Sequence, residues 1–261
     1  MTEKRADIPE RRQQRIAQLV RETGSVTVAG LEKEFGVSPA TARRDLADLE
    51  RQGKVRRTHG GAVMPGLAQH EDSFQQRLGE AVEAKKRLAR AASALLETEE
   101  SVFIDSSTTA YYALQRMLAD ASNVTFLTSL LPAMELFSTA DPTVVNMVGF
   151  GGMFRALTLS FVGPCTIRMI DRYRADRTFF SVKGIGPEGQ LTEANPLEAE
   201  VKRAMIRQAA NPVLLADGRK FERQGLSVVT HVSEVSLVMT ADARPVYVET
   251  LKDLGVTVQS V

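Results

Sequence analysis

The chain has 261 residues and a formal net charge of +1, and 43% of its residues are hydrophobic. This length exceeds the needs of one small domain and leaves room for a second domain with a large core. A single cysteine excludes an intramolecular disulfide and a cysteine-rich zinc site, and three widely spaced histidines give no metal-ligand pattern. We therefore expect no metal and no cofactor.

No segment approaches the roughly 18 consecutive apolar residues that a membrane-spanning helix needs. The N-terminal sequence MTEKRADIPERRQQR is charged and has no apolar segment behind it, unlike a secretory signal. These features predict a cytoplasmic protein without a membrane partner.

Two helices are predicted at the start of the chain, in RRQQRIAQLVRETG and TVAGLEKEFG. Each presents apolar side chains at helical spacing on one face. These are Ile16, Leu19 and Val20 in the first helix, and Val28, Leu31 and Phe35 in the second.

A third helix begins after Ser38, a favoured N-cap residue, with Pro39 at its first position and Gly53 beyond its end. Ala42, Leu46 and Leu49 form its apolar stripe. The opposite face carries Ala40, Thr41, Arg44, Ala47 and Asp48, with Arg43 on the flank. Small residues beside arginines suit a major groove, where Arg can bond to guanine O6 and N7.

Only residues 36–38 separate the second and third helices, which is the spacing of a helix-turn-helix. The segment KVRRTHGGAV then predicts a β-hairpin wing, with Arg56, Arg57 and His59 along the phosphates. Exposed arginines on a helix more often belong to an ordinary solvated face. Residues 1–66 carry 13 Lys and Arg against 9 Asp and Glu, which is only a mild excess of positive charge. The pattern alone therefore only favours DNA binding.

Residues 64–79 interrupt the periodicity and predict a linker between a DNA-binding domain (1–63) and a second domain (80–261). After a helix in EAVEAKKRLARAASALLE, short β-branched runs such as SVFID, NVTFLTS and NPVLLAD alternate with helical segments. This alternation predicts an open α/β fold with a parallel sheet.

Ligands of such sheets bind beyond the carboxyl ends of the strands, so the turns at those ends are candidate site residues. Hydroxyls at a helix start suit a phosphate or another anion, although they also serve as ordinary caps. Glycines allow a ligand close to the backbone but also make tight turns. The turns contain Asp105, Ser106, Ser107, Thr108 and Thr109; Thr128 and Ser129; Gly151 and Gly152; and Asp217 and Lys220.

The string VSPATARRDLADLERQGKVRRTHGGA resembles the helix-turn-helix signature of the DeoR family of bacterial transcriptional regulators. It has the V-S turn, the T-x-R-R-D-L helix, the L-E-x-x-G end and the R-x-H-G-G wing. Ala42 stands where the family more often has a β-branched residue, on the core face. The resemblance implies that the partner is a double-stranded DNA operator. The residues expected to contact it are Ser38, Ala40, Thr41, Arg43 and Arg44 of the third helix and Arg56, Arg57 and His59 of the wing.

From residue 80 onward the chain is similar to the sensor domain of these regulators, on its S-F-x-G-P, G-I…L-T, E-A-x-V-K-R and D-x-x-K segments. That domain resembles ribose-5-phosphate isomerase and CoA transferases and typically senses a phosphorylated sugar. The resemblance implies that Thr108 and Thr109 hold the phosphate near Lys220, and that Asp105 takes sugar hydroxyls. Additional candidates around the same pocket are Lys183, Thr192 and Lys202.

Two positions depart from the family pattern in the turns expected to hold the ligand. Ser107 replaces the usual glycine, and Ser129 replaces the usual asparagine. A sulfonated or carboxylated sugar derivative, or a sugar phosphate bound in a different pose, would therefore fit as well as a common hexose phosphate.

The resemblance implies a regulator, most simply a repressor of a carbohydrate operon, that acts as a homodimer or homotetramer. An isomerase-like enzyme is the alternative, with Asp105, Lys183 and Glu193 as candidate groups, but the sequence shows no catalytic geometry. A purely architectural DNA binder would leave the hydroxyl-rich turns without a role.

Overall fold

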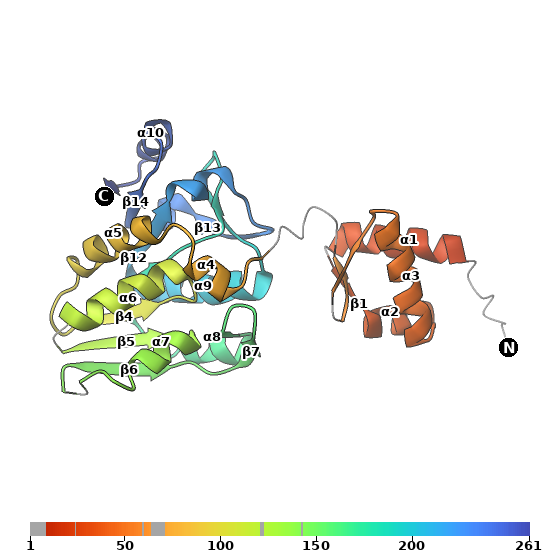
Figure 1. Ribbon diagram of the computed structural model, residues 1–261, viewed down its shortest axis with the longest axis horizontal. Coiled ribbons are helices and arrows are strands. Elements are labelled where there is room, and N and C mark those ends of the chain that lie inside the picture. Colours follow the sequence, from red (N-terminus) through yellow and green to blue (C-terminus); the bar gives the residue numbers. More distant parts are fainter. Residues whose placement is uncertain (1–8, 24, 59, 64–70, 121–122, 142) are drawn as a thin grey trace. The chain divides into compact units, whose positions relative to one another are not determined.

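A computed structural model describes residues 9–23, 25–58, 60–63, 71–120, 123–141 and 143–261. Contacts group the chain into two compact units, Met1–His70 and Glu71–Val261 (Figure 1). Among the described residues, no helix is long and apolar enough to cross a membrane.

The first unit contains three helices and a small antiparallel sheet. Its elements are α1 (Pro9–Thr23), β1 (Ser25–Thr27), α2 (Val28–Phe35), α3 (Pro39–Arg51), β2 (Arg56–Thr58) and β3 (Gly61–Val63). The predicted wing forms from β2 and β3, and β1 adds a third strand on the other side of β3. Three residues are too few to show strand alternation, so β1 was not predicted.

The predicted apolar faces of the three helices meet in the core of this unit, where Ile16, Leu31 and Leu46 are at most 1% exposed. A buried ion pair lies beside this core, because Arg12 Nε donates to Asp45 Oδ2 at 2.6 Å. The pair joins α1 to α3 and so fixes which face of α3 turns outward.

The second unit is an α/β domain. Its strands are β4 (Ser101–Ile104), β5 (Val124–Thr128), β6 (Val145–Gly149), β7 (Met153–Arg155), β8 (Ser160–Val162), β9 (Ala175–Phe180), β10 (Gly184–Ile185), β11 (Gln190–Glu193), β12 (Ala209–Asp217), β13 (Ser227–His231), β14 (Leu237–Ala241) and β15 (Val258–Ser260). Its helices are α4 (Phe74–Leu78), α5 (Val82–Ser93), α6 (Thr108–Asp120), α7 (Leu131–Leu136), α8 (Pro164–Ile170), α9 (Pro196–Gln208) and α10 (Pro245–Asp253), with short 3₁₀ turns η1 (Gly218–Glu222) and η2 (Val232–Glu234).

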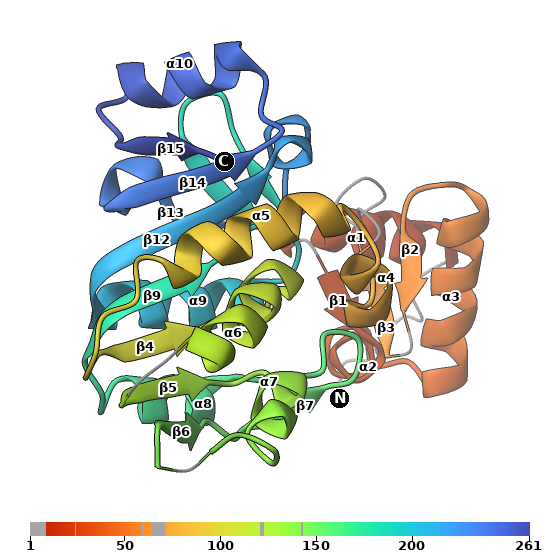
Figure 2. The ribbon, with the colours of Figure 1, turned by 60° about the vertical axis from the view of Figure 1, so that its left-hand side comes forward.

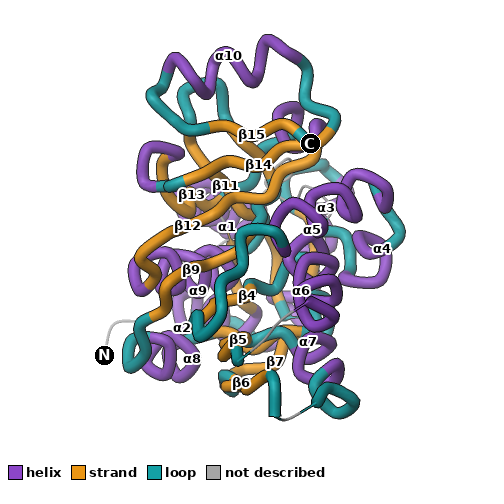
Figure 3. Tube along the Cα trace, turned by 90° about the vertical axis from the view of Figure 1, so that its left-hand side faces the viewer, coloured by secondary structure: helices purple, strands orange, loops and turns teal. Residues whose placement is uncertain are grey.

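Seven strands form a parallel sheet in the order β15-β14-β12-β9-β4-β5-β6. Helices α5 and α6 cover one face, and α8 and α9 cover the other (Figures 2 and 3). The sequence of β4 explains this, because Val102 and Ile104 join the core under α5 and α6, whereas Phe103 between them joins the core under α9. The predicted fold class, a winged helix-turn-helix unit followed by an open α/β domain, is confirmed.

Residues 71–79, which were expected in the linker, belong to the second unit. They contain α4, and Phe74 is 1% exposed in the core, with its ring 5.5 Å from that of Tyr111. Ser73 and Gln76 form a capping box at the start of α4. Most residues of this segment are polar, so the sequence predicted a linker, although the buried Phe74 attaches the segment to the domain.

Candidate functional site

The third helix of the first unit presents the surface that the sequence analysis assigned to DNA. Ser38 caps α3, because its Oγ accepts a hydrogen bond from the Thr41 backbone N–H at 3.2 Å. The exposed residues in the first turns of α3 include Ala40, Arg43 and Arg44. Small residues and arginines therefore share an outward face, as close approach to a major groove requires.

The wing carries Arg57 on β2, and its side chain is exposed. Its backbone N–H donates to Glu50 Oε1 at 2.8 Å, which ties the wing to the end of α3. Arg56 lies next to it in β2 and pairs with Val63 of β3. His59, the third predicted wing residue, lies outside the described residues.

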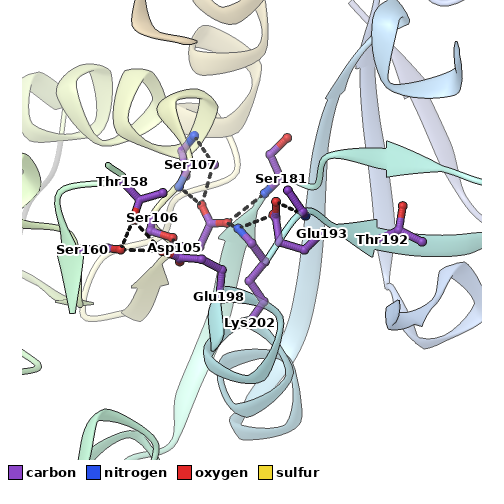
Figure 4. A network of polar contacts seen from close by, with 12 residues as sticks. Asp105, Ser106, Ser107, Thr158, Ser160, Ser181, Thr192, Glu193, Glu198 and Lys202 are labelled. Atoms are coloured by element: carbon purple, nitrogen blue, oxygen red, sulfur yellow. Dashed lines mark hydrogen bonds and ion pairs between the residues drawn. The ribbon is translucent and has the colours of Figure 1, made fainter. Parts of the chain in front are cut away.

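In the second unit, the turn after β4 is the centre of a buried polar network (Figure 4). Asp105 is completely buried, and its Oδ1 accepts hydrogen bonds from the Ser107 backbone N–H (2.9 Å) and hydroxyl (2.6 Å). Its Oδ2 accepts from the Ser181 N–H (3.2 Å) and forms an ion pair with Lys202 of α9. Burial opposes charge on Lys202, but Asp105 and Glu193 outweigh it and hold the pKa of Lys202 above its ordinary value.

A second buried carboxylate, that of Glu198 on α9, is the common hydrogen-bond acceptor of the neighbouring hydroxyls. It accepts hydrogen bonds from Ser106 (2.6 Å), Thr158 (2.7 Å) and Ser160 (2.6 Å), and from Arg155 Nη1 (3.0 Å). Burial acts to raise the pKa of Glu198, but these hydrogen bonds and Lys202 outweigh burial and keep the pKa below its ordinary value. The β4–α6 turn, the β7–β8 hairpin and α9 are thereby joined at one carboxylate.

Three cations, Arg77, Lys85 and Lys220, form a cluster beside the start of α6. The Thr108 hydroxyl (3.4 Å) and Lys85 Nζ both donate to the backbone carbonyl of Arg77. Burial, together with repulsion from nearby cations, lowers the pKa of Lys85 and that of Lys220 to about 8. Asp217 opposes this shift in both lysines.

The guanidinium of Arg77 has two buried nitrogen atoms, Nε and Nη2, without a hydrogen-bond partner. Leaving buried donors unsatisfied is costly, and a bound anion would satisfy them. The hydroxyl of Thr108 and the positive end of the 13-residue helix α6 lie beside the same cluster. The residues present can therefore hold a phosphate or a similar anion.

Thr128 is the last residue of β5 and Ser129 follows it, and Thr128 makes its contacts within the protein. Its hydroxyl donates to the Ile104 carbonyl at 2.8 Å and accepts from the Leu130 N–H at 3.1 Å. Ser129 Oγ is buried without a hydrogen-bond partner. Thr128 therefore supports the strand end, whereas Ser129 keeps a hydroxyl without a partner.

Gly151 and Gly152 make the turn between β6 and β7 and pack against α8. The Gly151 carbonyl accepts a hydrogen bond from Thr166 at 2.9 Å, and a Cβ on Gly152 would lie 2.0 Å from the Thr166 hydroxyl oxygen. Thr192 likewise donates to a backbone carbonyl, that of Gly184, at 3.0 Å. These three predicted residues have structural contacts that account for their presence.

The remaining predicted residues lie around the network. Thr109 is buried in the first turn of α6, and Asp217 caps η1 by accepting hydrogen bonds from Arg219. Lys183 lies after β9, with its Nζ 3.5 Å from Asp72 Oδ2. Four residues of the site could not be recognised from sequence patterns, because each reaches the site from a segment that looks like an ordinary helix, hairpin or linker: Arg77, Lys85, Arg155 and Glu198.

A cavity of about 30 Å³ lies among these groups. Its lining includes Glu71, Asp72, Arg77, Ser107, Ser181, Lys183 and Glu193. Typical small-molecule sites have roughly 300–1,000 Å³, so in this structure the segment 71–77 and the strand ends close the space. A hollow of about 660 Å³ at the amino end of β12 is larger, but it lies away from the polar turns at the carboxyl ends.

Two family models match the chain. Residues 12–66 match the DeoR-like helix-turn-helix domain, and residues 80–242 match the DeoR C terminal sensor domain. The chain also has a remote likeness to a solved structure of D-ribose-5-phosphate isomerase in complex with phospho-erythronic acid, with 14% identity over 54% of each chain and a TM-score of 0.40.

Curated relatives match almost the whole chain. The glycerol-3-phosphate regulon repressor of Escherichia coli is 30% identical over 89% of this chain and 91% of its own length. The L-fucose operon activator of the same species is 32% identical over 88% of this chain and 93% of its own length. The chain therefore belongs to the DeoR family of helix-turn-helix transcriptional regulators.

Proposed function

We propose that this protein is a cytoplasmic, sequence-specific repressor of a carbohydrate operon, and that a phosphorylated sugar or related anionic sugar derivative controls its affinity for DNA. The observation that carries the effector assignment is the pair of buried guanidinium nitrogens of Arg77, Nε and Nη2, that lack a hydrogen-bond partner beside Lys85 and Lys220. The relatives supply the class of operon, since their names refer to glycerol 3-phosphate and L-fucose.

The cation cluster gives the phosphate end of the effector site. Arg77 presents donors in a fixed plane that suits phosphate oxygens, and the two lysines add charge. The sugar end would then lie toward Ser107, Lys183 and Glu193, which line the small cavity. Ser107 Oγ is engaged with Asp105 and caps α6, so it narrows this end.

Asp105, a candidate base in the enzyme alternative, has both carboxylate oxygens engaged. One oxygen accepts from Ser107 and the other from Ser181 and Lys202. A general base must reach a substrate proton, and in this structure both oxygens of Asp105 contact protein donors instead. We propose that this domain senses a sugar and does not isomerise it.

Regulation needs coupling between two sites, and a typical coupling free energy of about 1–3 kcal/mol changes operator affinity roughly 5- to 150-fold. Recognition helices act in pairs on half-sites about one helical turn apart. We therefore propose a homodimer or homotetramer in which effector binding changes the geometry of the paired α3 helices.

Binding of an anionic effector is expected to stabilise the folded protein, and its affinity is expected to depend on pH. Anion binding favours charged Lys85 and Lys220, so it raises their pKa values from about 8 and takes up protons. Affinity should therefore be high at about pH 7 and fall as the pH rises through about 8. A ligand at about 100 times its Kd stabilises the folded state by roughly 2.7 kcal/mol, which a thermal-shift titration detects.

This titration would use inorganic phosphate, glycerol 3-phosphate and ribose 5-phosphate, with glycerol and ribose as uncharged controls. Equal shifts from phosphorylated and uncharged compounds, or shifts that grow above about pH 8, would contradict the anion site. Conversion of any hit to an isomer would establish the enzyme alternative instead.

Arg44→Ala is expected to cost about 1–3 kcal/mol on the operator and little on random DNA, because the exposed Arg44 would read a base edge. Arg57→Ala is the matched control, since an arginine on the phosphates should weaken all sequences alike and reduce the slope of affinity against salt. Fluorescence anisotropy on both DNAs at several salt concentrations separates these effects. Equal losses on operator and random DNA for Arg44→Ala would rule out its role in base reading.

A further inference from the structure

Two acidic residues at the very start of the second unit cover the sugar end of the proposed effector site. Glu71 accepts two hydrogen bonds from Arg155, from Nη1 at 3.0 Å and from Nη2 at 2.8 Å. Asp72 Oδ2 lies 3.5 Å from Lys183 Nζ. Both carboxylates also line the small cavity, so they fill space that a sugar would need.

These contacts differ from ordinary surface ion pairs. The side chains of Arg155 and Glu71 are only 15% and 20% exposed, and Arg155 also donates to the buried Glu198. A two-pronged carboxylate–guanidinium contact is among the stronger charged interactions in proteins. The carboxylate of Glu71 thus occupies the position in which the carboxylate or hydroxyls of a ligand could bind Arg155.

The attachment of this segment is uneven. Phe74 anchors its middle in the core, and the Phe74 N–H donates to the Leu157 carbonyl at 2.8 Å. Residues 71 and 72, in contrast, are only partly buried and are held by charged contacts. Charged contacts are the part of this attachment that a charged ligand can replace.

We propose that Glu71 and Asp72 are internal substitutes for the effector: they occupy Arg155 and Lys183 until a ligand anchored on Arg77, Lys85 and Lys220 displaces them. This inference rests on the proposed function. Displacement opens the closed cavity and frees the segment that directly follows the DNA-binding unit in the sequence. The competition also weakens the apparent affinity of a ligand that extends to Arg155 and Lys183, because only the open fraction of the protein can bind that end of it; inorganic phosphate on the cation cluster is not affected.

Glu71→Gln in the full-length protein tests this inference, because it removes the charge and keeps the shape. Glu100→Gln is the matched control: Glu100 also pairs with an arginine, Arg177, at 2.7 Å, but at the amino end of the sheet. Hydrogen exchange read by mass spectrometry should become about tenfold faster in residues 71–77 for Glu71→Gln and remain unchanged there for Glu100→Gln. Unchanged exchange in Glu71→Gln would overturn the proposal, whatever ligands do.

Ligand binding gives the second readout, with inorganic phosphate and phospho-erythronate as probes. Phospho-erythronate has a carboxylate at the end opposite its phosphate, so Glu71→Gln should lower its half-saturating concentration about tenfold, with inorganic phosphate changed by less than about twofold. Weaker binding of phospho-erythronate to Glu71→Gln would overturn the proposal. If the proposed function is wrong, neither probe binds to any variant. The hydrogen-exchange result is independent of ligand binding, so it still shows whether Glu71 holds residues 71–77 in place.

Discussion

Lys202→Met is expected to destabilise the sensor domain by about 3–5 kcal/mol, because it leaves the carboxylate of Asp105 buried without its cation. The lysine is 2% exposed and the aspartate is completely buried, so water cannot replace the lost partner. Urea unfolding of the full chain, followed through the transition of the larger domain, measures the loss. Lys252→Met, at an exposed position on α10, should change stability by less than about 0.5 kcal/mol.

The double variant Asp105→Asn/Lys202→Met distinguishes a charged pair from two independent packing contacts. If the pair is the origin of the effect, the double variant loses less stability than the sum of the single variants, by about 0.5–3 kcal/mol. Additive losses would show that Lys202 acts through its packing alone. The same result would favour the predicted role of Lys202 in effector binding, because its charge would then be available to a ligand.

The sequence predicted the parts of the site that come from one strand end. Asp105 through Thr109 follow β4 directly, and a carboxylate followed by four hydroxyls is visible without a structure. Strand and helix periodicity also predicted the alternation of the sheet, because β4 and its neighbours are long enough to show burial on both faces. Local pattern is sufficient wherever the chain supplies neighbouring groups consecutively.

The groups that arrive from distant segments could not be predicted in the same way. Arg77 and Glu71 belong to a polar stretch that resembles a linker, whereas the burial of Phe74 in the structure shows that this stretch packs on the domain. Glu198 and Lys202 are one turn apart on α9, but helical spacing does not reveal that their common face meets the turn after β4. Long-range contacts, and not residue types, decide which candidates bind and which support the fold.

This distinction divides the residues in and around the effector site, predicted or not, into two groups. Thr128, Thr192 and Gly152 each have a backbone or packing contact that accounts for the residue without a ligand. Arg77 and Lys220, in contrast, carry costs that the folded protein alone does not relieve: buried donors without partners and a depressed lysine pKa. Residues kept at a cost to stability are the better candidates for binding.

Lys220→Met is therefore expected to abolish the effector response and, in the same protein, to raise the free energy of unfolding. Burial lowers the pKa of Lys220 from 10.5 to about 8, so the charged lysine costs stability at all pH values below about 8 and the cost vanishes as the pH rises toward 10.5. Methionine keeps most of the volume and removes this cost. Loss of one charge-assisted contact of about 1.5–3 kcal/mol weakens phosphate binding roughly 10- to 150-fold, so the response is lost at ligand concentrations just sufficient to saturate the unsubstituted protein.

Three measurements on one preparation check this prediction: unfolding by urea at about pH 7 and pH 10, thermal-shift titration with inorganic phosphate and glycerol 3-phosphate, and operator affinity without ligand. Stability should increase at the lower pH only, ligand response should disappear, and operator affinity should stay nearly unchanged. Thr108→Ala should also abolish the ligand response, without the gain in stability, because its hydroxyl carries no charge. A Lys220→Met protein that is less stable and still responds to phosphate would show that Lys220 supports the fold. Lys220 would then not belong to the anion site.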